Sequence, residues 1–254
     1  MIDEGFSEWA GEPLESLAFI AERQRFRASG PAVAADALGI VARADRRGRL
    51  ARADRTAPAV VDLIRGGFCD ERGGLTPLGE RVRSHWGATA PVLEIARRGS
   101  TPGTLTAWAG PGSVLVAASS PVGEPPLSAG MLQLGMVSID GALPAICSWI
   151  GLQPVWSFAD GPVDVAAETY ERRVADASTA VPFDLAPHLE RLWSAEWTEY
   201  ACRSAQRTLR FVLTPEGLFS VTIAGSSARL VTVTPRAVFT AMLGQYSDAL
   251  ELAR

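Results

Sequence analysis

The stretch Thr104-Leu-Thr-Ala-Trp-Ala-Gly-Pro-Gly-Ser-Val-Leu-Val-Ala-Ala118 predicts a β-hairpin. Two runs rich in strand-forming residues flank Gly110-Pro-Gly112, a composition typical of a tight turn. A second stretch repeats the pattern, since Leu209-Arg-Phe-Val212 and Leu218-Phe-Ser-Val221 flank the turn Thr214-Pro-Glu-Gly217. Two similar hairpins in one chain point to a larger internal repeat.

The elements around the two hairpins follow the same order. A helix near Trp86 precedes the first hairpin, and a strand over 131–138 and a helix over 140–150 follow it. A helix with Asp184 as its N-cap, carrying Trp193 and Trp197, precedes the second hairpin. A strand over 230–233 and a helix reaching to about residue 250 follow it. Coincidence is the alternative, because helix, hairpin, strand, helix is a common order.

We therefore predict an α+β fold built from a duplicated helix–antiparallel strands–helix unit with pseudo-two-fold symmetry, in which helices flank a central, mostly antiparallel sheet. The expected parts are an N-terminal helical and arginine-rich segment (1–56), a first α+β half (57–152) and a second α+β half (153–254), within one compact domain. In the first part, a helix is expected over 13–27 and a loop over 43–55, whereas 31–40 is ambiguous.

Composition indicates a globular cytosolic protein. Of the 254 residues, 47% are hydrophobic, the net charge is −4 and the pI is about 5.3, which makes a nucleic-acid partner unlikely. The N-terminus has no signal-peptide pattern, and no apolar run approaches the ~20 residues of a membrane span. Lys and Asn are absent, as expected from a GC-rich genome, so every basic residue is Arg. The many arginines between Arg23 and Arg55 therefore carry less meaning than usual.

Few residues suggest a catalytic or metal-binding role. Cys69, Cys147 and Cys202 lie far apart and are expected to be buried free thiols. His85 and His188 have no ligand-spaced neighbours, so we expect no metal site and no catalytic residue. No phosphate-binding, nucleophile-elbow or zinc motif is present, and the acidic residues Glu168, Glu171 and Asp176 are expected on a solvated face. We expect a protein that is no enzyme and takes no cofactor.

Two side chains on the predicted strands are candidate partner-binding residues. Trp108 and Arg210 would each point away from the apolar face of their strand, and Trp and Arg are enriched at interface hot spots. They would lie on an open sheet face if nothing covers it. The alternative is a second layer of helices over that face.

Three segments resemble the EspG family of actinobacterial ESX (type VII) secretion chaperones. They are Ala57-Pro-Ala-Val-Val-Asp-Leu-Ile-Arg-Gly-Gly-Phe-Cys-Asp-Glu-Arg-Gly-Gly-Leu-Thr-Pro77, Thr214-Pro-Glu-Gly-Leu-Phe-Ser-Val221 and Val231-Thr-Val-Thr-Pro-Arg-Ala-Val-Phe239, in the duplicated layout. The resemblance covers roughly residues 55 to 250, and the arginine-rich segment 43–55 has no counterpart in it.

The resemblance implies a cytoplasmic, cofactor-free chaperone that holds the tip of a helical secretion substrate of the PE/PPE type. It implies contacts from the central sheet, its hairpin loops and the C-terminal helices. In this sequence the corresponding residues are Trp108, Gly110, Gly112, Arg210, Gln245 and Tyr246. The identity of the partner, the secretion system and the oligomeric state stay open.

A DNA-binding regulator is the strongest alternative. The run from Val60 to Val82 also resembles the wing and following helix of a winged-helix domain, and the nearby arginines would suit DNA. Residues 91–254 would then form an effector domain. The acidic total charge, the interspersed aspartates and the lack of a clear recognition helix argue against this interpretation.

Overall fold

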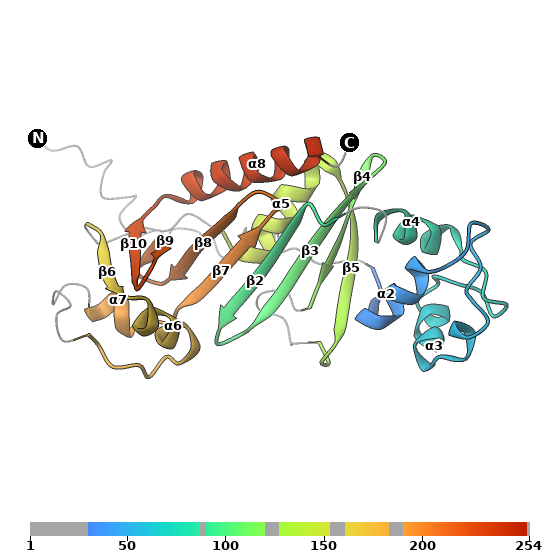
Figure 1. Ribbon diagram of the computed structural model, residues 1–254, viewed down its shortest axis with the longest axis horizontal. Helices are drawn as coiled ribbons and strands as arrows, with labels where there is room; N and C mark the ends of the chain where they lie inside the picture. Colours follow the sequence, from blue (N-terminus) through green and yellow to red (C-terminus); the bar gives the residue numbers. More distant parts are fainter. Residues whose placement is uncertain (1–29, 87–89, 120–126, 153–160, 183–189, 253–254) are drawn as a thin grey trace, which may run out of the picture.

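The computed structural model describes residues 30–86, 90–119, 127–152, 161–182 and 190–252. The expected helix over 13–27, the expected N-cap Asp184 and His188 lie outside these ranges. One large sheet runs along the length of the molecule, with helices at both ends and along one side (Figure 1).

The described strands form a single ten-stranded sheet in the order β1-β5-β4-β3-β2-β7-β8-β9-β10-β6. Every neighbouring pair is antiparallel. The strands are β1 (Ala32–Ala34), β2 (Leu93–Gly99), β3 (Gly103–Gly110), β4 (Ser113–Ala118), β5 (Met131–Ser138), β6 (Val163–Ala166), β7 (Thr198–Arg203), β8 (Thr208–Thr214), β9 (Gly217–Ala224) and β10 (Ser227–Thr232). Both predicted hairpins are confirmed, as β3–β4 and β8–β9.

Helices flank the sheet, which confirms the predicted α+β fold class. They are α2 (Ala35–Ala42), the 3-10 turn η2 (Asp54–Thr56), α3 (Pro58–Arg65), α4 (Pro77–His85), α5 (Ile139–Ile150), α6 (Ala167–Ala175), α7 (Glu190–Ser194) and α8 (Pro235–Leu252). The sequence explains several boundaries: Pro occupies the first position of α3 and α4, and Gly151 ends α5 with φ 74°.

The sheet consists of two equivalent halves that meet between β2 and β7. In each half four consecutive strands form a meander, β2–β5 or β7–β10, and a helix, α5 or α8, follows the last strand. Each half also has a short strand that passes directly into a helix, β1 into α2 and β6 into α6. β1 pairs with β5 as β6 pairs with β10. The first half therefore begins at Ala32, which lies inside the predicted N-terminal segment 1–56.

Hydrogen bonds at equivalent places support the duplication. The first amide of α2, at Ala35, donates to the carbonyl of Gly130 (2.9 Å), and the first amide of α6, at Ala167, donates to that of Ser226 (2.8 Å). Gly130 and Ser226 both lie just before the last long strand of their half, β5 or β10. The two halves thus share connections as well as the order of elements.

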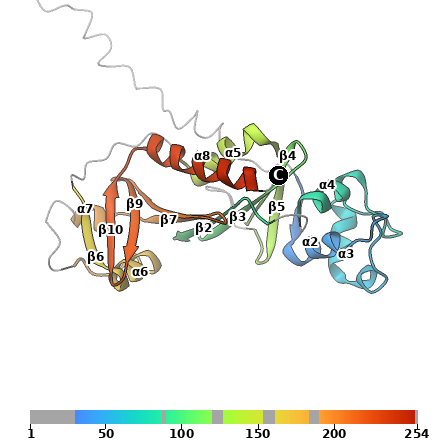
Figure 2. The same ribbon diagram turned by 45° about the horizontal axis from the view of Figure 1, so that its top comes forward.

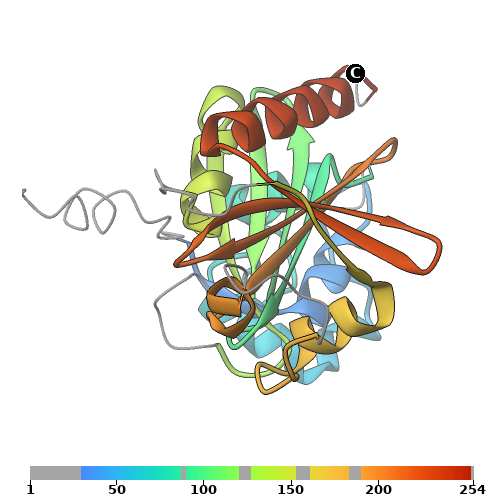
Figure 3. The ribbon, with the colours of Figure 1, turned by 90° about the vertical axis from the view of Figure 1, so that its left-hand side faces the viewer.

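Helices α5 and α8 cover one face of the sheet, which we call the first face (Figure 3). The core between them and the sheet includes Trp149 of α5, Met242 of α8, and Tyr200 and Phe211 of the central strands. Tyr200 donates its hydroxyl to the carbonyl of Ile150 at 2.6 Å, which fixes the end of α5 against β7. This core joins the two halves into one folded unit.

The opposite, second face is covered at its two ends by separate groups of helices. At one end α2, α3 and α4 pack on β1, β5, β4 and part of β3, and at the other α6 and α7 pack near β6 and β10 (Figure 2). Two separate apolar cores result, one containing Trp108 and Leu115 and the other Val212 and Phe219. The middle of the second face lies between them.

One central element differs from the sequence prediction. The helix expected to continue through Trp197 ends at Ser194 as α7, and strand β7 begins at Thr198. Trp197 is buried and donates its indole N–H to the carbonyl of Leu192 (2.8 Å), so it anchors the turn between helix and strand. Residues 198–203 form a strand because β2 and β8 pair with them on both sides.

Candidate functional site

Trp108 does not lie on an open surface. It is 7% exposed and packs against Trp86 at the end of α4, with ring centroids 4.3 Å apart and ring planes tilted by 39°. The alternative of a covering layer of helices is therefore correct for Trp108, and the expectation of an exposed indole is wrong. Trp86 itself is only half-buried and borders the middle of the second face.

The β3–β4 turn is held against α4 by its glycine. A Cβ on Gly110 would lie 2.5 to 2.7 Å from ring atoms of His85, so only glycine fits there. His85 is buried, with Nδ1 2.7 Å from the carbonyl of Arg81 and Nε2 3.1 Å from Ser113 Oγ. These contacts indicate that His85 has a structural role, because they hold the β3–β4 turn against α4. Gly112 is exposed in the turn, with φ 72°.

Gln245 and Tyr246 face inward from α8. The Gln245 side chain donates to the carbonyls of Cys202 (3.1 Å) and Arg207 (2.9 Å), and Tyr246 donates to the carbonyl of Ile139 (3.1 Å). Both side chains are at most 4% exposed, and burial raises the pKa of Tyr246 to about 12. Their position fixes α8 on the sheet, and the structure does not bring the six sequence-predicted residues onto one surface.

Arg210 belongs to a group of charged side chains on the second face, which we call the charge network: Arg98 on β2, Glu199 on β7, Arg210 on β8 and Glu171 on α6. Arg98 binds Glu199 through Nε and Glu171 through Nη1 at 2.6 Å. Arg210 Nη1 lies 3.4 Å from a carboxylate oxygen of each glutamate. Two positive and two negative charges therefore balance one another.

Burial differs sharply within the charge network. Glu199 is completely buried and also accepts a hydrogen bond from the hydroxyl of Tyr170 (2.7 Å), whereas Glu171 is 42% exposed. The hydrogen bond from Arg98 lowers the pKa of Glu171, and burial raises the pKa of Tyr170 well above its usual value. Glu171 is thus partly solvated, as expected, but it also binds both arginines, which the sequence did not indicate.

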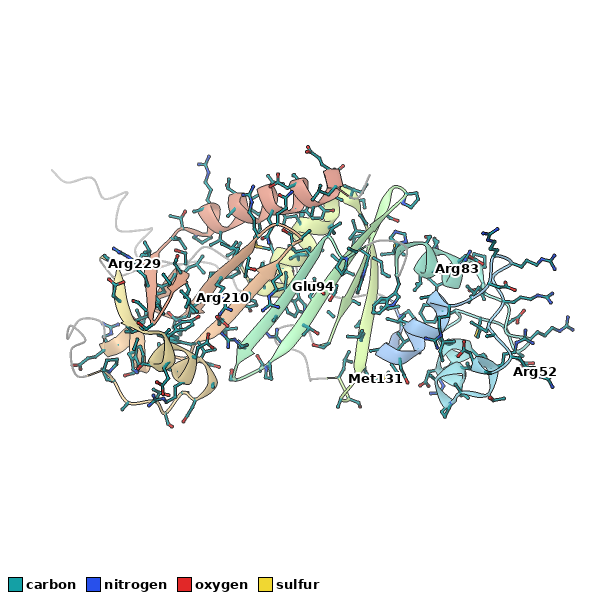
Figure 4. All side chains as sticks on the ribbon, in the orientation of Figure 1. Arg52, Arg83, Glu94, Met131, Arg210 and Arg229 are labelled. Atoms are coloured by element: carbon teal, nitrogen blue, oxygen red, sulfur yellow. The ribbon has the colours of Figure 1, made fainter. Side chains whose placement is uncertain are left out.

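Between the charge network and Trp86, the described helices leave part of the sheet uncovered. We call this surface the central strip: Glu94 and Ala96 of β2, Thr104 and Thr106 of β3, and Arg203 of β7. Glu94, Thr104 and Arg203 are exposed, and Ala96 and Thr106 are half-buried. Figure 4 shows Glu94 in the middle of the sheet, with Arg210 toward one end of the molecule. An antiparallel sheet tolerates such a solvated face.

The central strip is a rigid polar platform between two fixed borders. Its backbone groups are bonded within the sheet, so a partner would meet side chains already held in place. Sequence reasoning missed Glu94 and Glu199 because neither stands in a motif. The signal available in the sequence was the alternation on β2, which places Leu93 and Ile95 on one face and Glu94 and Arg98 on the other.

The three cysteines are inaccessible. Cys69, Cys147 and Cys202 are buried free thiols, as predicted, and burial raises the pKa of Cys147 to about 12. Within the described ranges, no three His, Cys, Asp or Glu side chains lie together as metal ligands would. Among the same residues, no helix combines the length and the apolar character that crossing a membrane requires.

Comparison with known proteins finds similar solved structures but no relative by sequence. No protein-family model and no curated protein matches the sequence. Among solved structures, the chain is similar to the Mycobacterium tuberculosis type VII secretion system chaperone EspG5, which was solved in complex with the PE25–PPE41 dimer. The match covers 88% of this chain and 96% of that chain, with 11% identity and a TM-score of 0.45.

Proposed function

We propose that this protein is a cytoplasmic chaperone or adaptor that binds the tip of a helical protein of the PE/PPE type and keeps it ready for type VII secretion. The proposal involves no catalytic step and no cofactor. The class of partner comes from the resemblance of residues 57–77, 214–221 and 231–239 to the EspG family. The binding site that we propose is the central strip, and its exposed charges and fixed borders support this choice.

The observation that carries the proposal is that the described helices cover both ends of the second face and leave its middle uncovered. Exposed Glu94 and Arg203 offer both signs of charge, and Thr104 offers a hydroxyl. Charges of fixed position set the register and choice of a partner more than its raw affinity. The half-buried ring of Trp86 at one border supplies the apolar contact that binding surfaces typically contain.

The charge network supports a rigid surface for binding. Because Arg98 and Arg210 are bound from two sides, they do not need to be ordered when a partner arrives, which lowers the entropic cost of association. The partner would therefore meet a preformed edge of the site beside α6.

The first experiment is purification of the tagged protein from its native cytosol, followed by identification of the co-purifying chains by mass spectrometry. A helical secretion substrate in stoichiometric amount is the expected result. Its affinity is then measured for the wild type, for Thr104→Arg on the central strip, and for Thr222→Arg as the control. Thr222 is also an exposed strand threonine, but it lies on β9 and on the first face.

We expect Thr104→Arg to weaken binding and Thr222→Arg to leave it unchanged. Absence of a helical partner would contradict the proposed function. If both substitutions change the affinity equally, the proposed function would stand, but the assignment of binding to the central strip would be contradicted.

A further inference from the structure

The first half of the fold contains a unit that the second half lacks. The chain needs 50 residues to pass from the end of α2 at Ala42 to the start of β2 at Leu93, but only 22 from Ala175 to Thr198 in the equivalent place. The extra chain forms η2, α3 and α4 at one end of the molecule (Figure 2). The second half forms its part of the sheet without such a unit, so we asked whether this unit has a role of its own.

The backbone of this unit has the order and pairing of a winged helix. Helix α2 is followed by an extended segment at 48–50, η2, α3, an extended segment at 68–70, a turn, and an extended segment at 73–76. Isolated β-bridges, Arg49–Gly74 and Cys69–Leu75, connect the last segment with the other two. The last segment bonds to the first through Leu50 N to Gly73 O (2.9 Å) and Leu75 N to Gly48 O (2.7 Å). It pairs with the second through Asp70 N to Gly74 O (2.8 Å) and Thr76 N to Phe68 O (3.0 Å).

In a winged helix, the helix before the hairpin and the turn of the hairpin both face DNA. Here these are α3 and the wing at 70–74. The helix that precedes α3 is reduced to the single turn η2, so the motif is shortened. The unit is nevertheless well packed, since Leu38, Leu50, Leu63 and Phe68 are at most 1% exposed. It is rigid enough to present a surface.

The unit is positively charged although the protein is acidic. Residues 30–86 carry ten Arg against seven Asp and Glu, which gives a net charge of +3. Because the whole chain has a net charge of −4, the remaining residues carry −7. Because the chain has no Lys, the use of Arg is not itself informative, but its concentration in this unit is. Such a charge distribution suits a phosphate backbone.

Several nearby carboxylates are already engaged in the turns. Asp45 Oδ1 accepts the backbone N–H groups of Arg47 and Arg49, both at 2.8 Å, and this lowers the pKa of Asp45. Asp70 Oδ1 likewise accepts those of Arg72 (2.9 Å) and Gly74 (2.8 Å). In the described part of the chain, seven exposed arginines of this unit form no ion pair: Arg46, Arg47, Arg49, Arg52, Arg55, Arg72 and Arg81.

The arginines of the wing and of the preceding loop lie close together. The bond between Leu50 and Gly73 joins the segment that leads to Arg52 with the wing that carries Arg72. Figure 4 shows Arg52 at the extreme end of the molecule, opposite Arg229. Glu71 on the wing is the acidic exception in this cluster.

We propose that this winged unit binds double-stranded DNA through its phosphate backbone, with Arg52 and Arg72 as contacts. The outer face of α3 presents Val61, Ile64 and an Arg65–Asp62 ion pair (3.3 Å). It offers few donors for base edges, so binding is sequence-tolerant. This surface is distinct from the central strip and does not depend on the protein partner.

The test is fluorescence anisotropy of a labelled DNA duplex with the full chain, in salt from about 50 to 200 mM. We compare the wild type with Arg52→Ala/Arg72→Ala and with the control Arg229→Ala/Arg236→Ala, which removes the same charge from the other half of the chain. Circular dichroism confirms that the variants are folded. The wild type should bind with a steep salt dependence, and the first variant should lower the slope of log K against log salt by about 2.

Equal slopes for the wild type and Arg52→Ala/Arg72→Ala would overturn the proposal, as would an equal loss in the control. Absence of duplex binding at low salt would also overturn it. Equal affinity for a single strand of the same length would contradict recognition of the duplex by the winged geometry.

Discussion

Glu94 on β2 and Arg203 on β7 lie directly opposite each other across the junction of the two halves, and both are exposed on the second face. The two halves therefore contribute one charge each to the same patch of the central strip. Neither half alone would form this surface. A partner that binds here would contact both halves of the duplicated fold.

Reversal of the charge at Glu94 should weaken binding of the helical partner. A charge reversal at the centre of an interface typically costs more than 1 kcal/mol, so we expect Glu94→Arg to raise Kd by roughly tenfold. Isothermal titration calorimetry against the purified partner measures this change. Glu251→Arg on α8, where the glutamate is also exposed, is the matched control and should have no effect.

The double variant Glu94→Arg/Arg203→Glu separates two explanations. If only the net charge of the patch matters, the swap restores affinity. If the partner contacts each position individually, the swap binds as weakly as the single variant. Unchanged affinity in both variants would contradict the placement of the partner on the central strip.

The two glutamates of the charge network should contribute differently to the free energy of unfolding, although they bind the same two arginines. Glu199 is fully buried, so Glu199→Ala leaves two arginines without their buried counter-charge and should cost about 3 kcal/mol. Glu171 is 42% exposed, and Glu171→Ala should cost no more than about 1 kcal/mol. Urea denaturation measures both free energies of unfolding, and equal losses would contradict this account.

The elements predictable from the sequence were those set by local signals. The strand boundaries at β4 and β5 follow from turn residues and from runs of strand formers, and the start of α4 follows from Thr76, which accepts the Gly79 N–H as an N-cap. Strand β7 was not predictable because its partners, β2 and β8, decide it. The tryptophans before it resemble a helical pattern and obscured its start.

The charge network could not be predicted, because Arg98 and Glu199 are 101 residues apart in the sequence. No local pattern connects them, and only the junction of the two halves brings β2 beside β7. One local signal in the sequence does connect the two halves. Val33-Ala-Ala-Asp36 and Val165-Ala-Ala-Glu168 stand at the same strand-to-helix step of each half and extend the internal repeat to the short strands.

The N-caps of α5 and α8 offer a test of the duplication. Ser138 accepts the N–H of Gly141 (3.1 Å), and Thr234 accepts that of Ala237 (3.2 Å), each just after the last strand of its half. Ser138→Ala and Thr234→Ala should each lower the free energy of unfolding by about 1 kcal/mol, and their sum should equal the loss in the double variant. Thermal and urea unfolding measure the losses. A negligible effect at one cap would show that the halves differ in how they fix their helices.

The charge network also predicts a dependence of stability on acid. Hydrogen bonding to Arg98 lowers the pKa of Glu171 below its ordinary value of 4.5, so the folded state favours the ionised carboxylate. This contribution is fully present above pH 4.5 and is lost as the pH falls through the lowered pKa of the folded state. The wild type should therefore lose its advantage over Glu171→Gln as the pH falls below 4.5. Urea denaturation of both proteins from neutral pH downward measures the difference, with Glu168→Gln on the exposed side of α6 as the control. A difference that stays constant across this range would show that Glu171 stabilises the fold by packing and not by its charge.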